Sequence, residues 1–582
     1  MMKREGGWGT GDEPFAGAQG RLSAEAAHPP SPVPHPAGRL GYVAILLLAI
    51  LSSAPSLTNA FAFDDVHIVQ YNDRVHALGG WWRLFGQSYW PPSHGATLYR
   101  PLTMMGFAAQ WAAGGGSPPV FHAASVLLYA LACLLVLRLA RALLEPAAAW
   151  AAAALFAVHP VHVEAVGNVV GQSELWAAIA VVAAVGLYLR VREAAAPTPA
   201  HVLALSGLYA AGCLAKEHAI VLPALLLAAE LTVVPDARAP RERAAALRPL
   251  YLALGAVAAL YLGARELVTG GVTYDDVNIA FAPQLGGSRP LTILGLVPEW
   301  ARLLLWPARL SADYSPQQTP VVAHFEPRLL AGVVLLAAAV GAAVAARRRL
   351  PAVTFGLAWT AATMLLVSNL LVPTGVLLAE RTLFLPSVGA ALAAGGAVQG
   401  LAGRWHSIAP ALRAASVAGL ALLLGAGVVR SAERQRVWRD TDSVVRQTLE
   451  DAPLSYTAHQ NAATLAFLRG LPGSGEREMR IAMRLMPYDA NLPTALADRY
   501  REAGLCAPAV PLYRAAIALA PPRVDARAGL AACLLALGEP ARARAEAQAA
   551  IAYGGRRRPE LERLRAAAER ALRTTRSGGA LK

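Results

Sequence analysis

Long apolar segments separated by short polar turns dominate the chain up to residue 429. Segments of about 20 consecutive apolar residues are typical of transmembrane helices. The pattern predicts about eleven of them, at residues 40–60, 119–142, 147–165, 173–190, 200–214, 218–235, 246–264, 328–346, 351–370, 382–401 and 410–429. The sequence therefore predicts an all-α fold, a polytopic membrane helix bundle. A disordered cytoplasmic N-terminal tail is expected at residues 1–39.

The arginines indicate how the bundle is oriented. They gather in alternate turns, at Arg138, Arg141, Arg190, Arg192, Arg238, Arg241, Arg243 and Arg347–Arg349. Because positively charged turns stay in the cytoplasm, the opposite turns are predicted to lie outside. These are the long loops 61–118 and 265–327 and shorter ones around Lys216 and residues 371–381. The apolar segment 291–310 contains two prolines, which favours an interfacial or re-entrant helix over a further span.

A 34-residue period begins after the last predicted span. Prolines, glycines and alanines recur at this interval, at Pro453, Pro487 and Pro521, at Gly470, Gly504 and Gly538, and at Ala482, Ala516 and Ala550. This period, with small residues where helices cross, is typical of tetratricopeptide repeats. We expect three repeats at residues 454–487, 488–521 and 522–555, and a capping helix at 559–575. Such an α-solenoid offers a concave groove for peptides.

Composition supports a membrane protein. Hydrophobic residues make up 55% of the chain and charged residues 15%, against about 25% charged in soluble domains. The formal net charge is +14. However, the arginines lie in turns between apolar segments, and no basic stripe interleaved with aromatic residues occurs. A nucleic-acid partner is therefore not predicted.

Two adjacent carboxylates, Asp64 and Asp65, follow the first predicted span in the segment FAFDDVHIVQYND. Neighbouring carboxylates repel, so the pKa of at least one should rise, which suits a general base acting on a hydroxyl. The alternative is that the pair begins a helix at Asp64. Five aromatic residues within Trp81–Trp90 share this loop, and they fit an interfacial belt, a sugar ring or a lipid chain.

Other outer segments bring further charged or polar side chains to the same side of the membrane. They are Arg100 in YRPL, His159, His162 and Glu164 in HPVHVEAV, Lys216 and Glu217 in AKEHAIVLP, and Glu380 and Arg381 in AERTLFLPSVG. Each adjacent acid–base pair alone favours mutual neutralisation, but ionisable residues beside spans are functional candidates. The histidine–carboxylate set lacks the HExxH spacing, so neither a metal site nor a cofactor is predicted.

The order of these motifs carries more information than any one of them. FDD, YRPL, FH (Phe121–His122), HPVHVEAV, AKEHAIVLP, LLLWPARLSADYS and AERTLFLPSVG follow one another and precede the repeats. In this order the sequence resembles the transmembrane-and-tetratricopeptide-repeat protein O-mannosyltransferases and their bacterial relatives, within the polytopic glycosyltransferase C (GT-C) superfamily. The resemblance covers about residues 40–555. It implies a GT-C-like transmembrane glycosyltransferase domain at residues 40–429 and a tetratricopeptide-repeat domain at residues 430–582.

The resemblance also implies a reaction. It is the inverting transfer of a sugar, mannose by analogy, from a polyprenyl-phosphate donor to a Ser or Thr hydroxyl of an exported protein. The family's acidic motif matches Asp64 and Asp65, one of which would deprotonate the acceptor. Arg100, Lys216 and Arg381 would neutralise the leaving phosphate. His159, His162 and Glu164 would line the donor pocket, with Glu217 beside Lys216.

Several alternatives stay open at this point. Three repeats are fewer than eukaryotic members carry, and the acceptor could be a lipid-linked glycan in place of a protein. A non-catalytic membrane anchor that presents the repeats to partner proteins is the main competitor. A transporter would be expected to show internal symmetry, which this sequence lacks. High alanine and arginine usage favours a bacterial inner membrane, with the repeats on the periplasmic side.

Overall fold

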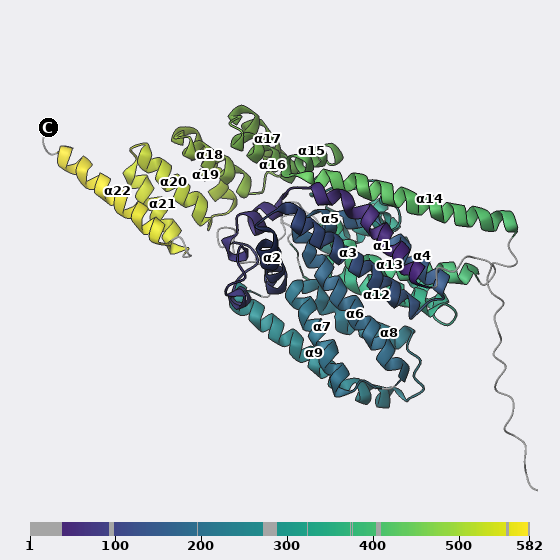
Figure 1. Ribbon diagram of the computed structural model, residues 1–582. Coiled ribbons are helices and arrows are strands. Elements are labelled where there is room, and N and C mark those ends of the chain that lie inside the picture. Colours follow the sequence, from purple (N-terminus) through teal and green to yellow (C-terminus); the bar gives the residue numbers. More distant parts are fainter. Residues whose placement is uncertain are drawn as a thin grey trace, which may run out of the picture.

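The computed structural model describes residues 38–91, 98–194, 196–271, 288–319, 321–322, 324–372, 374, 376–402, 409–553 and 558–579. Within these ranges the chain forms α-helices, 3₁₀ turns and one π-helical turn, and no strand. A helix bundle carries a stack of shorter helix pairs, which extends away from one end of the bundle (Figure 1). The all-α prediction is confirmed. The tail predicted at residues 1–39 lies outside the described residues up to residue 37.

The bundle follows the apolar segments closely. Its helices are α1 (Arg39–Ser53), α2 (Pro101–Gly114), α3 (Pro118–Arg141), α4 (Pro146–Ala157), α5 (Val163–Gly167), α6 (Gln172–Ala194), α7 (Pro199–Ala215), α8 (Leu222–Thr232), α9 (Pro240–Thr269), α10 (Arg289–Leu305), α11 (Pro327–Ala346), α12 (Pro351–Val367), α13 (Phe384–Ala402) and α14 (Pro410–Gln435). Many begin with proline. Proline suits the first helical position because the N–H there has no partner within the helix.

All eleven predicted spans fall on helical segments, but some of these segments are short. Among the described residues, seven helical segments are long and apolar enough to cross a membrane by length and composition. Helices α4 and α5, bent by 47°, give an eighth as a broken span. The spans predicted at 200–214, 218–235 and 351–370 correspond to helices of 17, 11 and 17 residues. Helix α7, for example, ends at Ala215, directly before the buried Lys216.

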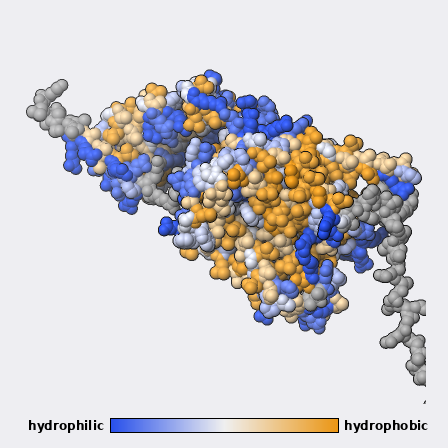
Figure 2. All heavy atoms as spheres, viewed as in Figure 1, coloured by the Kyte–Doolittle hydropathy of each residue, from blue (hydrophilic) through white to orange (hydrophobic). Residues whose placement is uncertain are grey.

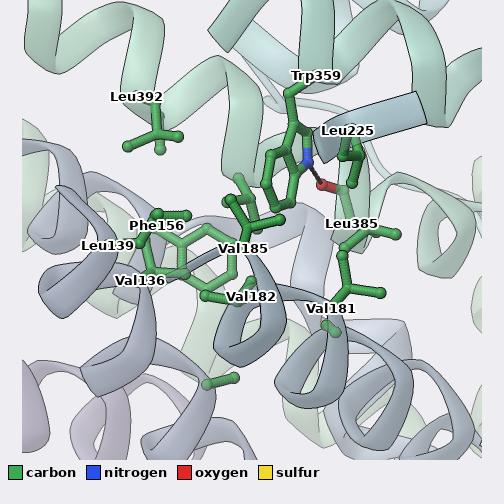
Figure 3. Packing of buried hydrophobic residues seen from close by; sticks show 14 of the residues in the cluster. Val136, Leu139, Phe156, Val181, Val182, Val185, Leu225, Trp359, Leu385 and Leu392 are labelled. Atoms are coloured by element: carbon green, nitrogen blue, oxygen red, sulfur yellow. Dashed lines mark hydrogen bonds between the residues drawn. The ribbon is translucent and has the colours of Figure 1, made fainter. Parts of the chain in front are cut away.

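The bundle interior is packed from aliphatic and aromatic side chains of α3, α4, α6, α8, α12 and α13. Figure 3 shows Trp359 in this core, where its indole N–H donates to the carbonyl oxygen of Leu385 at 2.9 Å. Helices α12 and α13 approach closely at Gly356 and Gly389. A Cβ on Gly389 would lie 2.4 Å from the Gly356 carbonyl oxygen, which is too short for an ordinary contact. Small residues allow such contacts between membrane helices. Hydrophobic residues also cover the visible bundle surface, whereas hydrophilic residues are frequent on the helix pairs (Figure 2).

Three helix pairs occupy the three predicted repeats. They are α16 (Tyr456–Leu468) with α17 (Pro472–Leu485), α18 (Asn491–Glu502) with α19 (Cys506–Leu519), and α20 (Val524–Ala536) with α21 (Pro540–Ala552). The glycines of the period turn the chain within each pair, with φ of 69° at Gly470, 76° at Gly504 and 75° at Gly538. Only glycine adopts this left-handed conformation without steric cost. Helix α22 (Arg558–Gly579) packs on α21, as expected of a cap.

The repeat stack is bonded to the bundle at one of the loops predicted to lie outside. Helix α15 (Thr441–Asp451) links α14 to the first repeat, and Arg434 forms an ion pair of 2.7 Å with Asp451. The hydroxyl of Ser455 donates to Asp313, in the loop after α10, at 2.7 Å. Helix α10 buries Leu296, Trp300 and Leu303 on one face and is not among the seven candidate spans. The outer loops and the repeats therefore form one continuous surface.

Candidate active site

A cavity of about 450 Å³ lies where the outer segments meet. Its polar lining consists of Asp64, Arg100, Ser173, Lys216, Glu217, His218, Arg265, Thr374, Arg381 and Thr382. Its apolar and aromatic lining includes Tyr89, Trp90, Tyr261, Leu262, Leu366, Val367, Val372 and Val376. The cavity thus combines charged side chains with apolar ones from α9 and α12, such as Leu262 and Leu366. Five residues predicted from four separate segments, Asp64, Arg100, Lys216, Glu217 and Arg381, share this one cavity.

The two adjacent aspartates have different surroundings. The carboxylate of Asp65 is fully buried and accepts hydrogen bonds from three backbone N–H groups, those of Ala62 at 3.3 Å, Val169 at 3.1 Å and Val170 at 2.8 Å. It thereby holds the 3₁₀ turn η7 (Val169–Gly171) against the first outer loop. Asp64 lines the cavity, and among the described residues its carboxylate has no hydrogen bond or ion pair. The structure therefore separates a structural carboxylate from one that is open to a ligand.

The alternative that the two aspartates begin a helix is correct for the backbone but not for the role of their side chains. A short helical segment does begin at Asp64 and continues as the π-helical turn η2 (Val66–Gln70). Within the described part of the chain, neither carboxylate caps this turn. Asp65 instead binds N–H groups that precede the turn or belong to η7. Asp65 therefore serves the contact between two loops, and the sequence pattern alone could not show this.

Asp65→Asn is expected to destabilise the protein by about 1–3 kcal/mol. An amide has one oxygen where the carboxylate has two, so at least one of the three N–H donors would lose its acceptor and face an NH₂ group. Thermal unfolding of the detergent-solubilised chain measures the change. Asp64→Asn is the matched control, and it should unfold close to the wild type. Equal unfolding temperatures for the two variants would contradict the structural assignment of Asp65.

Three cations of the cavity, Arg100, Lys216 and Arg381, each have a carboxylate partner from another segment. Arg100 forms two hydrogen bonds with Glu217, from Nε at 2.9 Å and from Nη2 at 2.5 Å. Lys216 pairs with Glu174, in the first turn of α6, and His218 lies 3.5 Å from the same carboxylate. Arg381 pairs with Glu164, which also accepts from the Arg381 backbone N–H at 2.8 Å. These pairs tie four outer segments into one frame.

The pairing expected between adjacent residues does not occur. Lys216 and Glu217 were expected to neutralise each other, but each binds a partner far away in the sequence. Glu380 likewise binds the backbone N–H of Ser311 at 2.6 Å and the hydroxyl of Tyr314 at 2.8 Å, away from Arg381. Consecutive side chains point in different directions, because Lys216 is extended and Glu217 opens the 3₁₀ turn η8 (Glu217–Val221). Glu174 was not singled out from the sequence, although it stands at the start of an apolar run.

Burial shifts the pKa values of ionisable side chains in and beside the cavity. Burial raises the pKa of Asp64, the guanidinium of Arg381 opposes this rise, and the carboxylate of Glu164 adds to it. Burial also raises the pKa of Asp65 to about 7, although its N–H donors favour the charged form. The pKa of Lys216 is lowered by burial against the opposing effect of Glu174. A raised pKa makes a carboxylate a stronger base when it is ionised, which favours proton transfer from a ligand.

Tyr89 adds an open hydroxyl to the lining. Its side chain is 1% exposed, and its hydroxyl has no hydrogen-bond partner among the residues that the structure describes. The Arg100 guanidinium lies over its ring, 5.2 Å from the centroid. A buried hydroxyl without a partner costs stability, so such groups are often completed by a ligand. The five aromatics within Trp81–Trp90 gave the only sequence signal for Tyr89, and this signal did not separate it from the others.

The structure does not place the two predicted histidines in this cavity. His159 donates to the Leu304 carbonyl oxygen through Nε2 at 3.0 Å and accepts from the Val161 N–H through Nδ1. His162 lies 3.0 Å from the Tyr129 hydroxyl and 2.8 Å from the Ser387 hydroxyl. Both rings are thus engaged at the bend between α4 and α5, and Glu164 reaches the cavity only through Arg381. Among the described residues, no group of three His, Cys, Asp or Glu side chains could hold a metal ion.

Comparison with known proteins identifies relatives. The chain is 35% identical over 294 residues to "Protein O-mannosyl-transferase Tmtc2" of Drosophila melanogaster, covering 47% of this chain and 30% of that protein. It is 28% identical over 367 residues to "Protein O-mannosyl-transferase TMTC3" of Mus musculus, covering 57% and 39%. It is 27% identical over 467 residues to "Protein O-mannosyl-transferase TMTC4" of Homo sapiens, covering 71% and 62%. The chain thus spans less than two thirds of the length of each of these relatives.

Two further comparisons add no argument about function. No protein-family model matches the chain. The crystal structure of the APC/C hetero-tetramer Cut9-Hcn1 covers 81% of this chain and 90% of the matched chain at 13% identity, with a TM-score of 0.23. The relationship therefore rests on the curated sequences. The resemblance to the TMTC family predicted from the motif order is confirmed, because the curated homologues of this integral membrane chain are protein O-mannosyl-transferases of the TMTC family. The resemblance to bacterial relatives has no support among these homologues.

Proposed function

We propose that this chain is a membrane glycosyltransferase that moves a sugar, mannose by resemblance, from a polyprenyl-phosphate donor to a protein Ser or Thr hydroxyl. The observation that carries the proposal is the carboxylate of Asp64. It faces a cavity lined by Arg100, Lys216, Arg265 and Arg381, with no hydrogen bond or ion pair to any described residue. A carboxylate in this position is available to a substrate hydroxyl. The names of the homologues supply the reaction class.

In the proposed step Asp64 takes the proton of the acceptor hydroxyl. The hydroxyl oxygen attacks the anomeric carbon of the sugar from the side opposite the phosphate, and the bond between that carbon and the phosphate oxygen breaks. The electron pair of this bond leaves with the polyprenyl phosphate. A single displacement inverts the anomeric configuration. General-base assistance of this kind contributes about 10²–10⁴-fold to a rate.

The cations of the cavity suit the leaving phosphate. Arg100, Lys216 and Arg381 are already paired with carboxylates, so their positions are fixed before a donor binds. Donors fixed in this way stabilise developing negative charge without reorganisation. The Tyr89 hydroxyl is available to an oxygen of the sugar or the phosphate. This preorganisation supports the proposal that the cavity receives the phosphate that the step releases.

The apolar side of the cavity suits the polyprenyl chain. Leu262 of α9 and Leu366 and Val367 of α12 line it. Both helices belong to the bundle surface on which exposed leucines such as Leu260 and Leu365 lie. A donor lipid would then keep its chain against apolar helices and its phosphate near Arg100. Desolvation of an isoprenoid chain favours this arrangement, since each buried CH₂ contributes about 0.8 kcal/mol.

The repeats are proposed to hold the exported acceptor, and the cavity is proposed to face the non-cytoplasmic side. The repeat stack is bonded to the loop after α10, and α14 is paired with the helix that leads into the stack. A second ion cluster joins Arg192, Glu230, Asp236 and Arg243. Its arginines belong to the sets predicted to be cytoplasmic, whereas Glu230 lies in α8, within the span predicted at 218–235. The two sets of turns thus gather separately, as the charge rule requires. A bacterial inner membrane remains our prediction, based on alanine and arginine usage.

Intact-mass comparison of exported proteins from cells with and without this chain tests the proposal. At least one exported protein is expected to carry additional hexose only when the chain is present. Complementation with Asp64→Asn is the matched control, and it should not restore the added mass. If residues 430–582 alone restored every difference between the two cell lines, the membrane part would be an anchor and the proposal would be wrong.

A further inference from the structure

The turn before Asp64 has an unusual backbone. Phe63 lies in the left-handed region, with φ of 57°. A left-handed conformation costs a residue with a Cβ about 1–2 kcal/mol. The other residue of this kind in the described part of the chain is Asn369, and asparagine tolerates the conformation better than phenylalanine does. Such strain persists only where the surroundings enforce it.

The segment after the last predicted span supplies these surroundings. The Phe63 N–H donates to the hydroxyl of Thr441 at 3.0 Å, and the Ala60 N–H donates to the carbonyl oxygen of Arg439 at 2.8 Å. The side-chain amide of Asn59 donates to the carbonyl oxygen of Gln435 at 3.0 Å. Three bonds thus join residues 59–63 to residues 435–441. These residues are nearly 380 positions apart in the sequence.

Trp438 fixes the same segment by packing. It is 2% exposed and belongs to a cluster with Ala62, Val163 and Val444. The Phe63 ring meets the Trp438 ring edge-on, with 6.4 Å between the centroids. Beneath them, a Cβ on Gly167 would lie 3.2 Å from the Trp438 Cβ. Residues 435–441 therefore pack between the first outer loop and α5, close to the turn η7 that Asp65 binds.

We propose that residues 435–441 are a positioning element for Asp64. By holding Phe63 in the left-handed conformation, they direct the Asp64 carboxylate into the cavity while Asp65 stays on η7. Thr441 and Phe63 are positioning residues, since neither lines the cavity. Thr441 is also the first residue of α15, so the bond to Phe63 ties the start of the repeat stack to the proposed base. This inference rests on the proposed function.

Thr441→Val in the full-length chain is the first test, in membranes supplied with polyprenyl-phosphate mannose and a Ser/Thr-rich peptide. Valine has the shape of threonine but no acceptor for the Phe63 N–H. We expect kcat to fall on the order of tenfold, because small misplacements of a reacting group are costly, while the KM for the donor stays unchanged. Thr441→Ser keeps the hydroxyl and should restore kcat. Thr448→Val is the control, because among the described residues that hydroxyl bonds only within α15, to the Val444 carbonyl oxygen.

A pair of variants at Phe63 tests the backbone conformation without relying on Thr441. Phe63→Gly and Phe63→Ala both remove the contact with Trp438, but only glycine adopts the left-handed conformation without steric cost. We therefore expect the glycine variant to have the higher kcat. The reverse order, or wild-type kcat in a folded Thr441→Val, would overturn the positioning role. That result would leave the proposed function intact if Asp64→Asn were inactive, whereas an active Asp64→Asn would refute the proposed function itself.

Discussion

Asp64→Asn is expected to lower the kcat of sugar transfer by about 10²–10⁴-fold while the chain remains folded. Asparagine has nearly the same shape but cannot accept the proton of the acceptor hydroxyl. Its cost to folding should be small, because the Asp64 carboxylate bonds to none of the described residues. Initial rates in membranes with lipid-linked mannose, at matched protein levels, measure the effect. Donor KM should change less than kcat, since the cations that meet the phosphate remain.

The pH dependence of wild-type kcat is a second test of the assignment of Asp64 as the general base. A general base acts in its ionised form, so the rate should rise with pH through the pKa of Asp64. Burial raises that pKa above the ordinary carboxylate value of 3.8. We therefore expect an acid limb in the kcat profile: kcat should fall at a pH above the range in which an exposed aspartate titrates. Any residual activity of Asp64→Asn should lack this acid limb. The same limb in the variant would assign it to another group.

Lys216→Met is expected to destabilise the chain by about 3–5 kcal/mol, because it leaves a buried carboxylate without its cation. The side chains of Lys216 and Glu174 are 5% and 3% exposed, and the remaining neighbour of Glu174 is His218 at 3.5 Å. Thermal unfolding in detergent measures the loss. The variant should also bind the donor more weakly, since Lys216 lines the cavity.

Two controls separate the buried pair from a general loss of charge. Lys216→Met combined with Glu174→Gln removes both charges and should recover much of the stability. Arg480→Met breaks the exposed pair with Glu476, whose members are 52% and 36% exposed, and should cost only about 0.3–0.5 kcal/mol. Wild-type stability of Lys216→Met would contradict the ion-pair frame of the cavity.

Apolar periodicity and the 34-residue period were sufficient to predict the helices. Segment length and turn residues are local properties, so the span at 119–142 is found as α3 (Pro118–Arg141) and the repeat glycines as left-handed turns. The lengths of α7, α8 and α12 were harder to predict. Helix α7, for example, stops directly before Lys216, which lines the cavity and pairs with Glu174, a neighbour far away in the sequence.

Several residues of the candidate site could be predicted from the sequence, but their hydrogen-bond and ion-pair partners could not. The order of the motifs indicated Asp64, Arg100 and Arg381 as candidate site residues, and in the structure all three line one cavity. The sequence could not separate Asp64 from Asp65, because the distinction depends on the N–H groups of η7, which are about a hundred residues away. It likewise could not pair Lys216 with Glu174, since adjacent opposite charges suggested a local pair.

Sugar transfer by the purified full-length chain tests the central claim most directly. The chain is supplied with polyprenyl-phosphate mannose of known anomeric configuration and a Ser/Thr-rich peptide, and the product is analysed by mass spectrometry and NMR. The account predicts one hexose on a Ser or Thr hydroxyl, with the anomeric configuration inverted, and a rate about 10²–10⁴-fold lower with Asp64→Asn. Product from Asp64→Asn at the wild-type rate, or a product with retained configuration, would contradict it.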